Sequence, residues 1–184
     1  MANLHKIKKF NALLEKTLNS LFRFAYSRCI DKTLAEDLVQ DTCLKAYKAY
    51  MEEGKEILKF KEWVFKILIN THISYLRKQR PETFSDLHLE DIENKHEQGK
   101  SIVNFEVKQD INHALTFLNK DQREVIYLVE IEGYSFKEAA EILGIPFGTL
   151  ASRLQRGRTK LRSLLLDMGY AEKKYVVRSS KGMT

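Results

Sequence analysis

Residues 133–165 read GYSFKEAAEILGIPFGTLASRLQRGRTKLRSLL, and this is the most informative part of the chain. Ser135, with Glu138 three residues later, forms a capping box, which predicts the start of a short helix. Gly144 suits the left-handed residue that ends such a helix, and Pro146 suits the first turn of a second one. We therefore predict two helices joined by a tight turn, which is the helix-turn-helix pattern.

The second of these helices has two chemically different faces. At about 100° per residue, one face carries apolar residues and a glycine: Leu150, Leu154, Gly157, Leu161 and Leu164. The opposite face is polar and basic, and it carries Thr149, Ser152, Arg153, Arg156 and Lys160. Arginine can read guanine edges, while hydroxyl groups and lysines can contact bases or phosphates. This segregation favours a helix that reads the DNA major groove over a surface helix with a merely solvated basic face.

The composition of the whole chain favours an all-α protein. Its 184 residues include 8 glycines and only 2 prolines, and the length allows one or two small domains. There is no apolar span of about 20 residues and no signal peptide, so we expect a cytoplasmic protein without membrane insertion. The 2 cysteines and 5 histidines lack metal-binding spacing. With no phosphate-cradling glycine loop or nucleophile elbow, the sequence predicts a non-enzymatic protein with no metal and no cofactor.

Charge is distributed unevenly along the chain. The net charge is +6, yet residues 54–80 carry 7 basic and 2 acidic side chains, and residues 146–184 carry 9 and 2. Between these segments, residues 81–110 carry 3 basic and 8 acidic side chains. Two basic segments separated by an acidic one suggest two nucleic-acid contacts.

Helical periodicity divides the chain into two units. Apolar residues at three- to four-residue spacing predict helices ahead of the helix-turn-helix over residues 4–30, 34–51, 60–80, 102–118 and 121–131. Pro81 ends the third helix, and the acidic, weakly patterned stretch after it reads as a linker. We predict two small helical domains joined by an acidic flexible linker, with a first domain at 1–80, the linker at 81–104, a second domain containing the helix-turn-helix at 105–166 and a basic tail at 167–184.

Three blocks in this order resemble the extracytoplasmic-function (ECF) group of bacterial RNA polymerase sigma factors. They are AEDLVQDTCLKAYKAY at 35–50, FKEWVFKILINTHISYLRKQR at 60–80, and the segment 118–165. The resemblance implies that the first domain is sigma region 2 and the second is sigma region 4. It also implies the function of an alternative sigma factor, which binds RNA polymerase core and directs promoter-specific transcription initiation.

The resemblance implies a role for each block. The first block is similar to the helix that docks on the β′ clamp helices of the polymerase, and its contact candidates are Asp37, Leu38, Gln40 and Asp41. The second is similar to the part that recognises and melts the −10 promoter element, with candidates Lys66, Asn70, Arg77, Lys78 and Arg80. The helix-turn-helix is similar to the −35 reader, with candidates Gly148, Thr149, Ser152, Arg153, Gln155, Arg156, Arg158 and Lys160. Within this set, Arg153 and Arg158 are expected at phosphates.

The expected partners are RNA polymerase core, through its β′ clamp helices and β flap, promoter DNA, and an anti-sigma factor. The main alternative is a stand-alone helix-turn-helix transcriptional regulator, which explains residues 133–165 but leaves the first two blocks unexplained. The sequence departs from the family pattern at Ala151, where a basic residue is frequent, and at Gly157, where alanine is usual. We expect the first change to alter the −35 preference, and the second to weaken its helix by roughly 0.5–1 kcal/mol.

Overall fold

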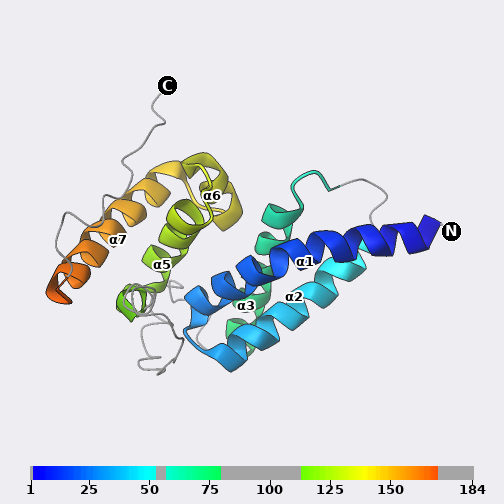
Figure 1. The fold of residues 1–184 in the computed structure, drawn as a ribbon, viewed down its shortest axis with the longest axis horizontal. Coiled ribbons are helices and arrows are strands. Elements are labelled where there is room, and N and C mark those ends of the chain that lie inside the picture. The colour runs from blue at the N-terminus through cyan, green and yellow to red at the C-terminus, as the bar shows by residue number, and fades with distance from the viewer. Residues whose placement is uncertain (1, 53–56, 80–112, 170–184) are drawn as a thin grey trace.

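The computed structural model describes residues 2–52, 57–79 and 113–169, and every regular element within these ranges is a helix (Figure 1). In chain order the elements are α1 (Ala2–Cys29), α2 (Lys32–Glu52), α3 (Phe60–Gln79), α5 (Lys120–Ile126), η1 (Tyr127–Ile131), α6 (Phe136–Leu143) and α7 (Phe147–Asp167). The predicted all-α class is confirmed for this part of the chain. The predicted linker at 81–104, Arg80 and the tail from residue 170 onward lie outside the described residues.

The first three helices form an N-terminal unit in which α1 and α2 lie side by side (Figure 1). Ile30 has a left-handed φ of 54° and ends α1 in a conformation that usually needs glycine. Asp31 then starts α2, because its side-chain oxygen accepts a hydrogen bond from the Leu34 N–H at 2.8 Å. A two-residue connection is therefore enough to turn the chain back along α1.

The core of the N-terminal unit is largely aromatic. Phe10 contacts Tyr50 and Phe60 with ring centroids 5.1 and 5.7 Å apart, and Phe24 stacks on Phe65 at 5.0 Å. Large rings of this kind bury much apolar area and fix the angles at which helices meet. The three helices predicted from periodicity in this unit are confirmed to within a few residues.

The buried stripe of α1 differs in detail from a purely apolar one. It includes Thr17, which is 4% exposed, whereas Leu18 beside it is 42% exposed. The Thr17 hydroxyl donates a hydrogen bond to the Leu13 carbonyl at 2.8 Å, so the polar group is satisfied within the helix itself. Burial therefore costs little at Thr17, and Leu18 falls at the edge of the stripe.

The C-terminal unit contains α5, η1, α6 and α7. Asn119 forms a capping box with Gln122 and starts α5. The helix predicted over residues 121–131 changes type at Tyr127, where the wider π-helical turn of η1 begins, and the Glu132 N–H donates to the Tyr127 carbonyl five residues back. Apolar periodicity predicts the extent of this helix correctly, but it does not predict that the last turn is π-helical. None of the helices in the described ranges combines the length and apolar character needed to cross a membrane.

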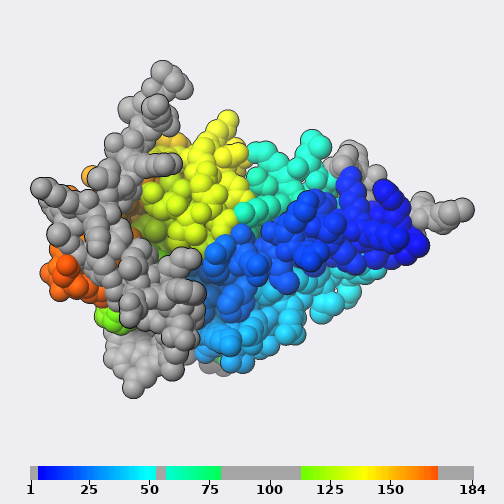
Figure 2. All heavy atoms as spheres, in the orientation of Figure 1, coloured from blue at the N-terminus to red at the C-terminus, as the bar shows by residue number. Residues whose placement is uncertain are grey.

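The two units pack against each other and share one hydrophobic core. Helix α1 contacts α5, and α3 contacts α6, so the C-terminal helices lie against α1 and α3 (Figures 1 and 2). Aromatic rings cross the boundary, with Phe24 and Tyr127 at 5.5 Å and Phe65 and Tyr134 at 6.2 Å between centroids. We call this boundary between α1–α3 and α5–α6 the seam.

Candidate nucleic-acid interface

The helix-turn-helix has the local geometry that the sequence predicts. The Ser135 N–H donates to Glu138 Oε2 at 3.1 Å, and the Ser135 side chain accepts from the Glu138 N–H at 3.3 Å. Gly144 ends α6 with a φ of 67°, in the left-handed region. Helix α7 starts immediately after Pro146. The capping box and the glycine turn are therefore confirmed, whereas Pro146 is the extended N-cap residue, one position ahead of the first turn in which it was predicted.

The apolar face of α7 packs inward as predicted. Leu150 and Leu154 are fully buried, and Gly157 lies against α5. A Cβ atom on Gly157 would come within 2.9 Å of Ile126 Cδ1 and 3.3 Å of Gln122 Cβ. The glycine therefore permits a close approach of α5 and α7, which offsets its weaker helix propensity. This packing fixes which face of α7 is left outside.

The outer face of α7 carries most of the predicted −35 candidates. Exposed among them are Gly148, Ser152, Gln155, Arg156 and Lys160, and Thr149 is half-buried. At about 100° per residue, Ser152, Gln155 and Arg156 share one side of the helix. An arginine, a hydroxyl group and an amide on one exposed face suit base edges and nearby phosphates.

Two of the candidate arginines are engaged within the C-terminal unit. Arg153 pairs with Asp121 at 2.6 Å, and Arg158 Nε donates to Glu130 Oε1 at 2.7 Å. These bonds connect α7 to α5 and η1 and hold both guanidinium groups beside an acid. The sequence pattern indicates neither Asp121 nor Glu130 as a partner, because a contact across a pair of helices leaves no local signal. The phosphate role of these arginines stays a prediction.

A second basic face lies on α3. Lys66, Asn70 and Arg77 are exposed and fall within about 40° of one another around the helix. Lys78 is exposed on an adjoining side, and Arg80 lies outside the described residues. Trp63 is half-buried against the core, with its ring 5.7 Å from that of Phe60, as expected for a packing residue. Helix α3 thus presents cations and an amide without an exposed aromatic platform.

Beside this face, an open pocket lies where α3 meets α6. Its lining residues come from both units: Ile57, Lys59, Glu62, Trp63, Lys66, Glu138, Glu141 and Ile142. Lys59 pairs with Glu138 across the pocket at 3.5 Å. The acids of α6 therefore lie close to the basic face of α3.

The polymerase-contact candidates lie on α2, and one of them needs correction. Asp37, Gln40 and Asp41 are exposed on one face. Leu38 is only 2% exposed, because it lies about 100° around the helix on the core side. It cannot touch a partner in this structure, and its role is packing. Leu44, one turn beyond Gln40, is 61% exposed and adds an apolar group that the sequence analysis missed.

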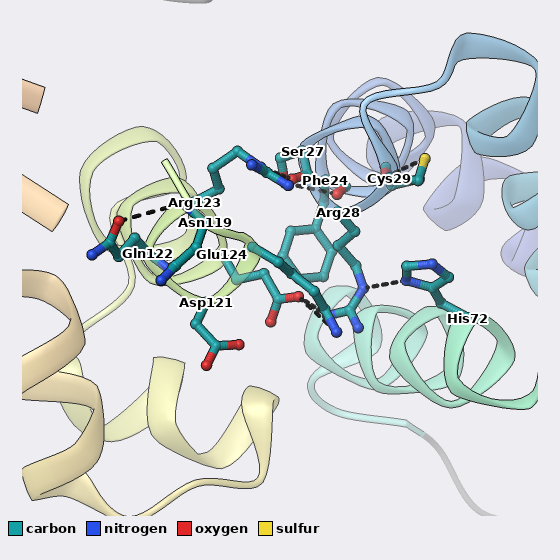
Figure 3. Close-up of polar contacts among 12 residues, drawn as sticks. Phe24, Ser27, Arg28, Cys29, His72, Asn119, Asp121, Gln122, Arg123 and Glu124 are labelled. Atoms are coloured by element: carbon teal, nitrogen blue, oxygen red, sulfur yellow. Dashed lines mark hydrogen bonds and ion pairs between the residues drawn. The ribbon is translucent and has the colours of Figure 1, made fainter. Parts of the chain in front are cut away.

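The seam contains a buried polar cluster (Figure 3). Arg28 Nη1 and Glu124 Oε1 lie 2.6 Å apart, with side-chain exposures of 2% and 7%. Arg28 Nε donates to His72 Nδ1 at 3.1 Å. Burial, helped by the positive charges of Arg28 and Lys120, lowers the pKa of His72 to about 2. The imidazole is therefore neutral and serves as an acceptor.

A second polar group crosses the seam at Glu132. Lys61 Nζ lies 2.5 Å from Glu132 Oε2, and the Tyr127 hydroxyl lies 2.6 Å from Oε1 and 2.9 Å from the Ser20 carbonyl oxygen. Burial alone would raise the pKa of Glu132, but hydrogen bonds from Lys61 and Tyr127 outweigh it and lower that pKa. The carboxylate thus stays charged and binds groups from both units.

Comparison with known proteins assigns both units to families. The chain matches the family described as Sigma-70 region 2 over residues 13–82 and the family described as Sigma-70, region 4 over residues 108–161. It is 36% identical over 151 residues to the ECF RNA polymerase sigma factor EcfG of Rhodopseudomonas palustris (strain TIE-1), covering 79% of each chain. It is 31% identical over 148 residues to the ECF RNA polymerase sigma factor SigM of Bacillus subtilis (strain 168), covering 80% of this chain and 89% of that one.

Solved structures agree with these relatives. The chain is similar to the sigma factor RpoE of Bartonella quintana, crystallised with the anti-sigma factor NepR, with a TM-score of 0.65, 37% identity and coverage of 86% of this chain and 98% of that one. It is also similar to CnrH in complex with the cytosolic domain of CnrY, with a TM-score of 0.58, 25% identity and coverage of 89% and 90%. On these matches, the chain belongs to the extracytoplasmic-function group of RNA polymerase sigma factors.

Proposed function

We propose that this sigma factor binds RNA polymerase core through the exposed face of α2 and reads promoters through α3 and α7. The observation that carries the proposal is the separation of these surfaces. An acidic and polar face on α2 and basic faces on α3 and α7 all point away from the core. They occur in the same order as the matched regions 2 and 4.

In this proposal α7 reads the −35 element as duplex DNA. Ser152, Gln155 and Arg156 face the base edges in the major groove, and Lys160 contacts the phosphate backbone. The paired Arg153 and Arg158 orient α7 in the free protein and exchange their acids for phosphates on binding. Ala151, where the family often has a basic residue, gives the helix a −35 preference of its own.

Helix α3 acts at the −10 element. Lys66 and Arg77 follow the backbone of the separated strand, and Asn70 between them reads a base edge, since an amide can both donate and accept. Lys78 adds charge on the adjoining side. Neither basic face needs high affinity alone, because both are tethered to one polymerase and the second contact benefits from a high effective concentration.

The proposed partners follow from the surfaces and the relatives. Asp37, Gln40 and Asp41 offer a negative patch for the β′ clamp helices, and the C-terminal unit meets the β flap. One similar structure is a sigma factor crystallised with an anti-sigma factor, and another is CnrH in complex with the cytosolic domain of CnrY, so we propose an anti-sigma factor for this chain as well. A protein that works on polymerase core acts in the bacterial cytoplasm.

Binding and transcription assays test the proposal. Purified chain should bind polymerase core in a pull-down and should direct transcription from specific promoters in a reconstituted system. A stand-alone regulator would bind duplex DNA through α7 but would neither bind core nor start transcription. Lack of core binding by a correctly folded chain would therefore refute the proposed function.

A further inference from the structure

The start of α7 carries an exposed aromatic residue that the proposed −35 contacts do not use. Phe147 is the first residue of the helix and is 59% exposed. Its ring lies beside that of Phe136, the first residue of α6, with centroids 6.1 Å apart and planes at 42°. Phe136 is half-buried and packs against the core. The Phe147 ring is therefore supported on one side by a packed ring and is open over much of its surface.

This ring adjoins the side of α7 that faces DNA in the proposed function. Residues four apart are offset by only about 40° around a helix, so Phe147, Ala151 and Gln155 follow one another towards that side. Ala151 is half-buried and short, where a basic residue is frequent in the family. Because residues four apart are neighbours on a helix surface, this short side chain leaves the adjacent part of Phe147 uncovered. We call Phe136, Phe147 and Ala151 the apolar flank of the helix-turn-helix.

The chemistry of the major groove offers one apolar partner for the apolar flank. The N-terminal residues of a recognition helix lie closest to the base edges, and Phe147 is at the N-terminus of α7. The bases present hydrogen-bonding groups in this groove, and their one apolar substituent there is the C5-methyl group of thymine. Phenylalanine and alanine both suit contact with this methyl group, whereas neither side chain can pair with a phosphate or a guanine edge.

We propose that the apolar flank makes this sigma factor prefer thymine at one position of the −35 element, with the Phe147 ring packed against the thymine methyl group and Phe136 positioning that ring. The inference rests on the proposed −35 role of α7, and it adds a base preference together with the residues that carry it. At Ala151 the chain exchanges a possible charged contact for an apolar one. The preference is for the methyl group itself, so it does not depend on the hydrogen bonds made by Ser152, Gln155 and Arg156.

Removing the methyl group alone tests the proposal. Polymerase core carrying the full-length chain first selects its −35 element from duplexes that are randomised at that element. Each thymine of the selected element, on either strand, is then replaced in turn by deoxyuridine, which keeps every hydrogen-bonding group of thymine and lacks only the methyl group. We expect one of these replacements to weaken binding about fourfold, which corresponds to one methyl group losing an apolar contact.

Substitutions at Phe147 show whether this residue carries the methyl preference. Phe147→Ser should bind the thymine and deoxyuridine duplexes equally, whereas Phe147→Leu should retain part of the preference because leucine is still apolar. Neither change disturbs the core, since Phe147 is exposed and α7 begins directly after Pro146. Phe136→Leu keeps an apolar side chain against the core but removes the ring beside Phe147, so the methyl preference should fall. An unchanged preference in Phe136→Leu would refute its positioning role.

Phe117→Ser is the matched control. Phe117 is 50% exposed, but it lies ahead of α5 and outside the helix-turn-helix, so this variant should keep the full preference. If the unmodified chain binds thymine and deoxyuridine duplexes equally at every position, or if Phe147→Ser keeps the methyl preference, the inference is overturned.

The free full-length chain separates this inference from the proposed function. If the chain does not bind polymerase core, the same selection and replacements are carried out with the chain alone. A methyl preference in that case would refute the sigma-factor function and support the apolar flank as a thymine reader. Promoter-specific transcription with core but without a methyl preference would refute the inference alone.

Discussion

Lowering the pH from about 7.5 to about 5 should destabilise the folded protein through His72. Its imidazole is 2% exposed and accepts a hydrogen bond from Arg28 at Nδ1, so a proton there would face a guanidinium group. Burial, then the charges of Arg28 and Lys120, lowers the pKa of His72 from 6.5 to about 2. The unfolded chain therefore takes up this proton first. The contribution of His72 is complete above about pH 6.5 and is lost progressively as the pH falls towards 2.

The size of the effect follows from the pKa difference. Each pH unit below the pKa of the unfolded imidazole lowers the free energy of unfolding by about 1.4 kcal/mol. Between about pH 7.5 and about pH 5, His72 should therefore lower it by about 2 kcal/mol. Urea unfolding followed by circular dichroism measures this change. The matched variant His72→Gln can still accept from Arg28 but does not titrate, so its loss over the same interval should be about 2 kcal/mol smaller.

Comparing the pH dependence of the wild type with that of His72→Gln isolates the contribution of the His72 imidazole. Glu132 also has a lowered pKa, and its stabilising effect is lost as the pH falls below the usual carboxyl range, outside the interval used here. His88 and His96 lie outside the described residues, but they are present in both proteins and cancel in the difference. An identical pH dependence of the wild type and His72→Gln would refute the argument.

Three other predictions concern the promoter reader and the polymerase face. Arg156→Ala should weaken binding of −35 duplex by about tenfold or more in a fluorescence anisotropy assay, with core binding unchanged, since it removes a base contact; an equal loss in both assays would point to misfolding. Asp41→Arg and Leu44→Ser should each lower affinity for polymerase core in a pull-down titration while −35 duplex binding survives, and unchanged core affinity would remove this face from the interface. Gly157→Ala should lower the melting temperature slightly, because Ile126 Cδ1, 2.9 Å from the added Cβ, has to turn away within a buried contact and Gln122 Cβ, at 3.3 Å, has to shift as well. Adding Ile126→Val should recover part of that loss, and a more stable Gly157→Ala protein would contradict the packing argument.

Features encoded within a few residues were predictable from the sequence. The capping box of Ser135 and Glu138 and the left-handed turn at Gly144 depend on local backbone bonding, so the structure repeats them as predicted. The apolar face of α7 follows from helical periodicity in the same way. The family resemblance supplied the function, which periodicity alone could not have given.

Features that depend on distant partners were not predictable. Arg28 reads in the sequence as a cation near a helix end, yet its partner Glu124 lies 96 positions further along the chain. The motif match predicts a contact role for Leu38, whereas its place around α2 shows that it faces the core. The seam arises from pairings of this kind, for which one sequence carries no periodic signal.

The capping residue Glu138 makes two separate contacts with its two carboxylate oxygens. Its Oε2 atom accepts hydrogen bonds from Ser135, whereas its Oε1 atom faces Lys59 of the other unit. Because the two contacts use different oxygens, losing the lysine leaves the start of α6 intact. The start of α6 is therefore fixed by bonds within the helix-turn-helix itself, and the contact with Lys59 can form or break without changing how this helix begins.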